Sequence, residues 1–160
     1  MSGLAPSDGV FSKILVGIDG SDHSRRALEM ATNLARIHGS EVLVLHVVDR
    51  VEQPRAIREL AHLEHIPFED EQARYLAGQA LSDAMTRAAA DEMRAKGVER
   101  IRPCVAEGRP ARQIIELAKQ ENVDLIVLGS RGLGDIGSVL LGGVSHKVAH
   151  LSECPCLLVR

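Results

Sequence analysis

The sequence predicts an α/β fold with a five-stranded parallel sheet and helices on both faces. Short, almost continuously apolar runs are typical of strands that are buried on both sides. Amphipathic segments with helical spacing alternate with these runs, which gives the order βαβαβαβαβ. The length of 160 residues suits one domain with a sizeable core. We therefore expect residues 1–160 to form a single domain with right-handed crossovers.

Five segments carry the strand pattern. They comprise residues 13–19, 41–49, 100–106, 124–129 and 155–159. Pro103 lies inside the third and weakest of them, and it has no N–H to donate, so we expect that strand at an edge of the sheet or at a bulge. The last run ends the chain and is also expected at a sheet edge.

Four helices are expected between the strands. The first has one apolar face, with Ser21 as its candidate N-cap and Gly39 as its candidate C-cap. The second, a long helix, is expected to bury a stripe of small apolar residues: Ala73, Ala77, Ala80, Leu81, Ala84 and Ala88. The stripes of the third and fourth helices comprise Ala111, Ile114, Ile115 and Ala118, and then Val144, Val148 and Leu151. Together these elements predict a Rossmann-like α/β sandwich.

Two stretches do not fit the alternation. Residues 1–11 are expected to be a loose N-terminal tail, and residues 50–70 an irregular excursion after the second strand. Glu41 and Asp124, at the ends of strands, are expected to be solvated charges.

Composition excludes several classes of protein. The net charge is −3, and the chain has two Phe, one Tyr and no Trp, so neither a basic surface nor a base-stacking platform for nucleic acid is expected. No apolar run is long enough to span a membrane, and the start of the chain does not resemble a signal peptide. Three cysteines without a secretion signal favour reduced thiols in the cytoplasm.

The segment after the fourth strand is rich in glycine and reads GSRGLGDIGSVLLGGVSHKV, residues 129–148. Ligands of open parallel sheets bind beyond the carboxyl ends of the strands. Glycines allow a backbone to approach a phosphate closely, and Gly142 and Gly143 directly precede a helix whose positive end favours an anion. Arg131 and Ser145 add a cation and a hydroxyl. These residues predict a di- or triphosphate site, and the alternative is a flexible surface loop.

Other chemistry finds little support in the sequence. The glycines match neither the P-loop pattern nor the dinucleotide fingerprint, which should follow the first strand. His146 and His150 are spaced for one helix face, but no third metal ligand is evident. His46, within an apolar strand, is interpreted as a core histidine. We expect no metal-ligating residue, no catalytic residue, and at most slow hydrolysis of a nucleotide.

The spacing Gly129-x2-Gly132-x9-Gly142 resembles the nucleotide motif G-x2-G-x9-G-[S/T] of the universal stress protein family. The resemblance runs from about residue 12 to residue 160 and includes KILVGIDGSDHS, LHVVD and CPCLLV. It implies binding of ATP, or of ADP or AMP, with Mg²⁺ able to accompany the phosphates. It also implies a homodimer through the last strand, residues 155–160.

The same resemblance implies roles for individual residues. Those matching the nucleoside side are Gly17, Ile18, Asp19, Val47, Leu128 and Gly129. Those matching the phosphate side are Arg131, Gly132, Gly142, Gly143, Val144 and Ser145. From the residues alone, Asp19 before Gly20 could equally shape a turn.

One position departs from the family pattern. Gly143 stands where the family often has Ser or Thr, so a hydroxyl contact is lost while the backbone N–H remains. We expect weakened rather than abolished nucleotide binding, with the preference among tri-, di- and monophosphate left open. The leading hypothesis is an adenine-nucleotide-binding regulatory protein of the stress response. The alternatives are a nucleotide-independent interaction protein and, third, a slow ATPase or phosphoryl transferase.

Overall fold

The computed structural model describes residues 10–48, 71–132 and 142–160. The strands are β1 Lys13–Gly17, β2 Glu41–Val48, β3 Ile101–Glu107, β4 Leu125–Gly129 and β5 Cys156–Val159. The helices are α1 Asp22–His38, α3 Glu71–Ala95, α4 Pro110–Gln120 and α5 Gly143–Leu151. The five strands form one parallel sheet in the order β3-β2-β1-β4-β5. The predicted fold class is therefore confirmed.

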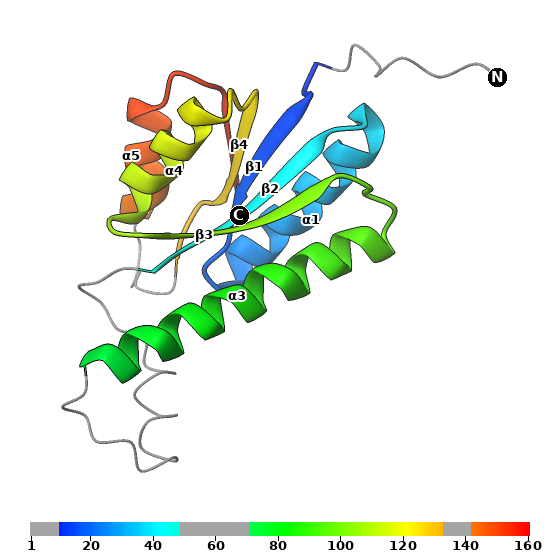
Figure 1. Cartoon of the computed structure of the whole chain (residues 1–160). Helices are drawn as coiled ribbons and strands as arrows, with labels where there is room; N and C mark the ends of the chain where they lie inside the picture. The colour runs from blue at the N-terminus through cyan, green and yellow to red at the C-terminus, as the bar shows by residue number, and fades with distance from the viewer. Residues whose placement is uncertain (1–9, 49–70, 133–141) are drawn as a thin grey trace.

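The sheet lies between two helical layers (Figure 1). α1 and α3 cover one face, and α4 and α5 cover the other. Successive side chains of each central strand point to opposite faces of the sheet. In β2, Val42 and Val44 pack toward α1 and α3, whereas Leu43 and Leu45 pack toward α4 and α5. This double burial explains why the strands read as continuous apolar runs.

The two edge strands differ in chemistry. β3 contains Pro103, and its position at one edge agrees with the expectation from the sequence. β5, at the other edge, is the apolar segment CLLV, with all four residues half-buried. The missing N–H of proline makes β3 the poorer template for another strand, whereas β5 carries no such block.

Local signals determine the ends of α1. Ser21 is the N-cap, and its side chain accepts a hydrogen bond from the backbone N–H of Ser24 at 3.1 Å. Gly39 ends the helix in the left-handed conformation at φ 64°, which glycine adopts without a steric cost. Both caps were predicted from the sequence, and both are confirmed.

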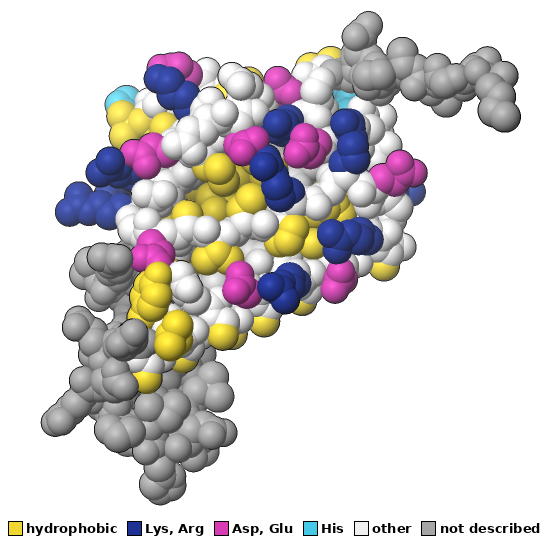
Figure 2. Space-filling model, viewed as in Figure 1, with side chains coloured by type: hydrophobic (Ala, Val, Ile, Leu, Met, Phe, Trp, Pro, Cys, Tyr) yellow, Lys and Arg dark blue, Asp and Glu magenta, His cyan; other side chains and the backbone are white. Residues whose placement is uncertain are grey.

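The buried face of α3 differs from the predicted alanine stripe. Ala77, Ala80, Ala84 and Ala88 are exposed, and hydrophobic side chains line the outer edge of α3 in Figure 2. The inner face instead consists of Gly78, Ser82, Thr86, Ala89, Ala90 and Met93. The hydroxyls of Ser82 and Thr86 donate to backbone carbonyls one turn earlier, at 2.8 and 3.0 Å, so their burial leaves no polar group unpaired.

The amino-terminal end of the sheet is held by charged residues expected to be solvated. Asp124 accepts hydrogen bonds from the backbone N–H groups of Ser12 and Lys13, both at 2.8 Å. Glu41 forms an ion pair with Lys13 at 3.5 Å. Next to them, Phe11, which was assigned to the tail, packs against the core and meets the His38 ring edge to face.

Most of residues 1–11 and all of residues 50–70 lie outside the described residues. Within the described helices, none combines the length and the apolar character needed to cross a bilayer.

Candidate functional site

The carboxyl ends of β1 and β4 lie side by side at the centre of the sheet. The chain order reverses there: β1 is followed by β2 on one side, while β4 and β5 lie on the other. The crossover after β1 leads into α1 and the crossover after β4 leads into α5, on opposite faces of the sheet. This topological switch point is where doubly wound sheets bind ligands.

The turn after β1 is tightly hydrogen-bonded. Oδ1 of Asp19 accepts from the backbone N–H of Ser21 at 2.9 Å, and the backbone N–H of Asp19 donates to the hydroxyl of Ser24 at 3.3 Å. Asp19 therefore shapes the turn, as the plainer interpretation of the sequence proposed. Its second carboxylate oxygen has no hydrogen-bond partner within the described parts of the chain, so it is available to a ligand.

Ser130, directly after β4, connects three elements at the switch point. Its backbone N–H donates to the carbonyl of Val159 in β5 at 2.7 Å. Its carbonyl accepts from the backbone N–H of Gly142 at 2.7 Å and from the hydroxyl of Ser145 at 2.9 Å. Its hydroxyl lies 3.0 Å from Nδ1 of His23 in α1. Because Ser130 is only 1% exposed, these bonds fix the start of α5 relative to β4 and α1.

The amino-terminal end of α5 carries free backbone donors. The N–H groups of Gly143, Val144 and Ser145 are the first three of the helix, so they have no acceptor within it. No side chain within the described residues caps this end. The Ser145 hydroxyl is buried and donates to the carbonyls of Ser130 and Gly142, and the Gly142 N–H is held by Ser130. What these residues offer a ligand is therefore the backbone amides of 143–145.

The wall beneath the switch point is closely packed. A β carbon on Gly17 would lie 2.6 Å from Cδ2 of Leu128. The absence of a side chain at Gly17 therefore lets the Leu128 side chain of β4 pack against the backbone of β1. Val47 packs with Leu128 on the α4 and α5 face, whereas Ile18 packs on the α1 and α3 face. The structure thus places Gly17 against Leu128, Val47 on the same face of the sheet as Leu128, and Ile18 on the opposite face.

Arg131 and Gly132 follow Ser130 and are both half-buried. Arg131 makes no ion pair with any residue in the described ranges. Gly134 and Gly137 of the glycine-rich segment lie outside the described residues. The predicted phosphate side is therefore described at its two ends, residues 129–132 and 142–145.

His46 lies near the site and is bonded to the long helix. Its Nδ1 lies 2.8 Å from the hydroxyl of Ser82 in α3. Burial lowers the pKa of His46, and the nearby negative charge of Asp19 partly offsets this by raising it. Its half-burial and hydrogen bond agree with its interpretation as a core histidine.

Two residues of this site were not found by sequence reasoning. The predicted site omits Ser130, although this residue lies inside the glycine-rich segment. Its position directly after a strand could have indicated a place at the site. His23 gave no signal, because its relation to Ser130 arises only when α1 packs on β4.

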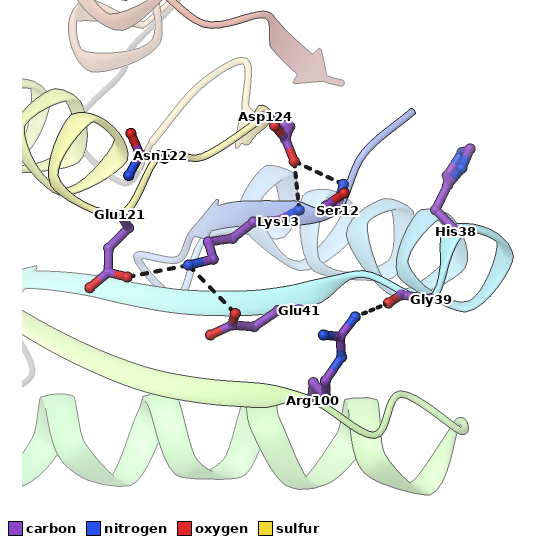
Figure 3. Close-up of a pocket in the computed structure, with 9 residues that line it drawn as sticks. All are labelled: Ser12, Lys13, His38, Gly39, Glu41, Arg100, Glu121, Asn122 and Asp124. Carbon is purple, nitrogen blue, oxygen red and sulfur yellow. Dashed lines mark hydrogen bonds and ion pairs between the residues drawn. The ribbon is translucent and has the colours of Figure 1, made fainter. Parts of the chain in front are cut away.

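A pocket lies at the opposite, amino-terminal end of the strands (Figure 3). This pocket of about 440 Å³ is lined by charged side chains, among them Lys13, Glu41, Arg100 and Glu121. Lys13 is paired with both glutamates at 3.5 Å, and Arg100 donates to the carbonyl of Gly39. Lys13 and the two glutamates neutralise one another, and Arg100 is bonded to the backbone. We therefore interpret the pocket as a structural ion-pair network.

Fold and site together define a doubly wound α/β protein with a helix N-terminus at its topological switch point. The model of the Universal stress protein family matches residues 11–160. The chain belongs to the universal stress protein family.

Individual relatives agree with this assignment. The chain is 39% identical to universal stress protein YxiE of Bacillus subtilis over 153 residues, which is 94% of this chain and 100% of that protein. Among solved structures, hypothetical protein MJ0577 superposes with a TM-score of 0.73 at 27% identity, over 94% of this chain and 96% of that one. A universal stress protein in complex with cAMP superposes with a TM-score of 0.65 at 27% identity, over 94% and 97% of the two chains.

Proposed function

We propose that this universal stress protein binds an adenine nucleotide, as ATP, ADP or AMP, across the carboxyl ends of β1 and β4. The nucleoside would lie over the residues Gly17, Ile18, Asp19, Val47, Leu128 and Gly129. The phosphates would lie between the segment after β4 and the start of α5, with the residues Arg131, Gly132, Gly142, Gly143, Val144 and Ser145. Nucleotide occupancy would then act through a conformational change or a partner contact.

The observation that carries this proposal is the set of three amides at residues 143–145, which have no acceptor within the described parts of the chain. These donors lie at the positive end of the α5 dipole, which attracts anions. Ser130 holds them in place before any ligand arrives, so little ordering entropy is lost on binding. Arg131, without an ion pair among the described residues, supplies a positive charge beside them.

The nucleoside side rests on Asp19 and on the relatives. Asp19 keeps one carboxylate oxygen for a ligand, and a carboxylate at this place suits a ribose hydroxyl. A solved universal stress protein 27% identical to this chain is a complex with cAMP, an adenine nucleotide. The carboxylate favours a nucleoside ligand, and the relative favours adenine as its base.

Mg²⁺ would be held mainly by the phosphates. The described residues contain no group of three or more His, Cys, Asp or Glu that could hold a metal. No positioned general base for hydrolysis is found near the α5 amides in that part of the chain. We therefore propose a binding protein with at most slow hydrolysis, and the three free thiols favour the cytoplasm as its location.

The test removes one donor without disturbing the helix. Proline is favoured at the first helical position, and Gly142 has φ −68° and ψ 159°, which suits a residue before proline. Gly143→Pro deletes one amide donor, whereas Gly143→Ala keeps it. In calorimetry with ATP, ADP and AMP, we expect Gly143→Pro to bind ATP roughly ten-fold more weakly and Gly143→Ala to bind like wild type.

Absence of binding by the wild-type chain at millimolar nucleotide would reject the proposal. The protein would then act as a nucleotide-independent interaction module of the same fold.

We further propose that two copies of the chain pair through β5. The carbonyls of Pro155 and Val159 accept hydrogen bonds from the β4 side, at 2.9 and 2.7 Å. Successive strand residues point their backbone groups in opposite directions, so Cys156 and Leu158 direct theirs to the open edge. An apolar edge without proline is a ready template for a second strand.

Two substitutions at one position test the pairing. Leu158→Pro removes an outward N–H without breaking a bond to β4, and proline is tolerated there because the N–H faces outward. Leu158→Ala removes the side chain and keeps the N–H. Light scattering should show a dimer for wild type and Leu158→Ala and a monomer for Leu158→Pro, and a dimeric, folded Leu158→Pro would exclude this interface.

A further inference from the structure

His23 occupies an unusual place in the first turn of α1. A β carbon on Gly129 would lie 2.7 Å from the carbonyl carbon of His23, so the helix backbone packs directly on the end of β4. This contact brings Nδ1 of His23 to 3.0 Å from the hydroxyl of Ser130. The carbonyl of the same Ser130 holds the start of α5. His23 is thus connected through one residue to the free amides at 143–145.

The hydrogen-bond pattern favours one of the two positions for the His23 proton. Within residues 10–48, 71–132 and 142–160, the Ser130 hydroxyl has no acceptor other than Nδ1 of His23. When the hydroxyl donates to Nδ1, the neutral imidazole carries its proton on Nε2. Nε2 has no hydrogen-bond partner in the same ranges, and the side chain is only half-buried. The ring therefore offers an N–H donor at the carboxyl end of the sheet.

We propose that His23 is a further phosphate-binding residue, which donates its Nε2–H to the nucleotide, and that Ser130 is the residue that positions the His23 ring. This inference rests on the proposed function, because it concerns the same bound nucleotide. It adds a donor from α1 to the amides of α5 and the guanidinium of Arg131. An anion between these groups would be contacted from both helical layers of the sandwich.

A purely structural role for His23 makes different predictions. If the bond to Ser130 only joined α1 to β4, its loss would lower stability and affect every ligand equally. A donor to phosphate instead discriminates between ligands with and without phosphate. The comparison of ATP and ADP with adenosine therefore separates the two roles.

The experiment is calorimetry of ATP, ADP and adenosine with the whole chain. His23→Leu removes the donor, and we expect roughly ten-fold weaker binding of ATP and ADP with unchanged binding of adenosine. His23→Gln keeps an amide N–H and should recover most of the affinity. Ser130→Ala removes the hydrogen bond that positions the His23 ring. It should lose less affinity for ATP and ADP than His23→Leu, and its binding of adenosine should be unchanged. His38→Gln, at the other end of α1, is the matched control and should bind like wild type.

A second measurement needs no variant. Imidazole ¹⁵N spectra of the wild type should show the proton of His23 on Nε2 and a shift of this signal with ATP but not with adenosine. The proposal for His23 would be overturned if His23→Leu bound ATP like wild type, or if it lost equal affinity for ATP and for adenosine. It would also be overturned if the Nε2 signal of the wild type did not shift with ATP. Wild-type protein that binds neither adenosine nor ATP would instead reject the proposed function itself.

Discussion

Gly129 and His23 lie in direct backbone contact: a β carbon on Gly129 would lie 2.7 Å from the carbonyl carbon of His23 and 2.8 Å from its β carbon. The first glycine of the nucleotide motif therefore has a packing role in addition to its place beside the site. It permits the start of α1 to lie on the end of β4, where Ser130 can meet His23.

Replacement of Gly129 should destabilise the fold. In Gly129→Ala the new methyl group meets backbone atoms, which cannot move aside as a flexible side chain can, and we expect a loss of ~1–3 kcal/mol in the free energy of unfolding. The matched control is Gly143→Ala, because no atom of the described residues lies within 4 Å of a β carbon there. Urea denaturation checks both, and equal stability of the two variants would contradict the packing role of Gly129.

The departure of Gly143 from the family motif can be reversed. Since no described residue lies within 4 Å of a β carbon there, Gly143→Ser places a hydroxyl beside the amides of 143–145 without a clash with the described part of the chain. One added hydrogen bond to a phosphate is worth ~0.5–1.5 kcal/mol, so ATP should bind several-fold more tightly. Calorimetry of ATP binding should compare Gly143→Ser with Gly143→Ala, which adds volume but no hydroxyl. The difference in affinity between the two variants is the contribution of the hydroxyl. Tighter binding by both variants would assign the gain to the backbone instead.

The N-cap of α1 gives a prediction that is independent of any ligand. Ser21→Ala removes the acceptor for the Ser24 N–H and should cost ~1 kcal/mol of stability. Ser21→Asp keeps an acceptor and should restore most of it. Thermal unfolding should rank the chains as wild type, Ser21→Asp and Ser21→Ala in decreasing stability, and a neutral Ser21→Ala would show that the cap contributes little.

His46 should contribute to the pH dependence of stability. Burial lowers the pKa of His46 in the folded protein, against a weaker raising effect from Asp19. The unfolded chain then binds a proton more readily, so the free energy of unfolding falls as the pH drops below about 6.5, and this loss is complete below the folded-state pKa.

His46→Asn removes the titrating group and keeps an amide near Ser82. Urea denaturation at about pH 7.5 and about pH 5 should show a smaller acid loss of stability for this variant than for wild type. A steeper acid loss in the variant would mean that His46 is not the group whose proton uptake opposes folding.

Sequence patterns predicted the sheet and the caps well because those depend on local chemistry. The strands, Ser21, Gly39 and the edge position of Pro103 follow from hydrophobic runs, capping and a missing N–H. The predicted buried face of α3 was wrong. Alanine is apolar but small, so it buries little area on either face of a helix and does not determine which face turns inward. Ser82 and Thr86 could be buried instead, since their hydroxyls bond to their own helix.

The site was predictable only in part, for a related reason. Glycine spacing located the segment after β4, but not which backbone donors remain free. Gly142 and the hydroxyl of Ser145 are used internally by Ser130, a contact that requires β4 and α5 to be folded together. Likewise, the sequence does not reveal the partners of Asp124 and Glu41, because Ser12 and Lys13 are distant in the sequence or lie on another strand.

The proline in β3 bears on the proposed pairing of two copies. A sheet that could extend at both margins would let copies add without end and grow into fibrils. With one margin interrupted by Pro103 and the other open at β5, the proposed joining of identical chains through their strands would stop at a closed pair.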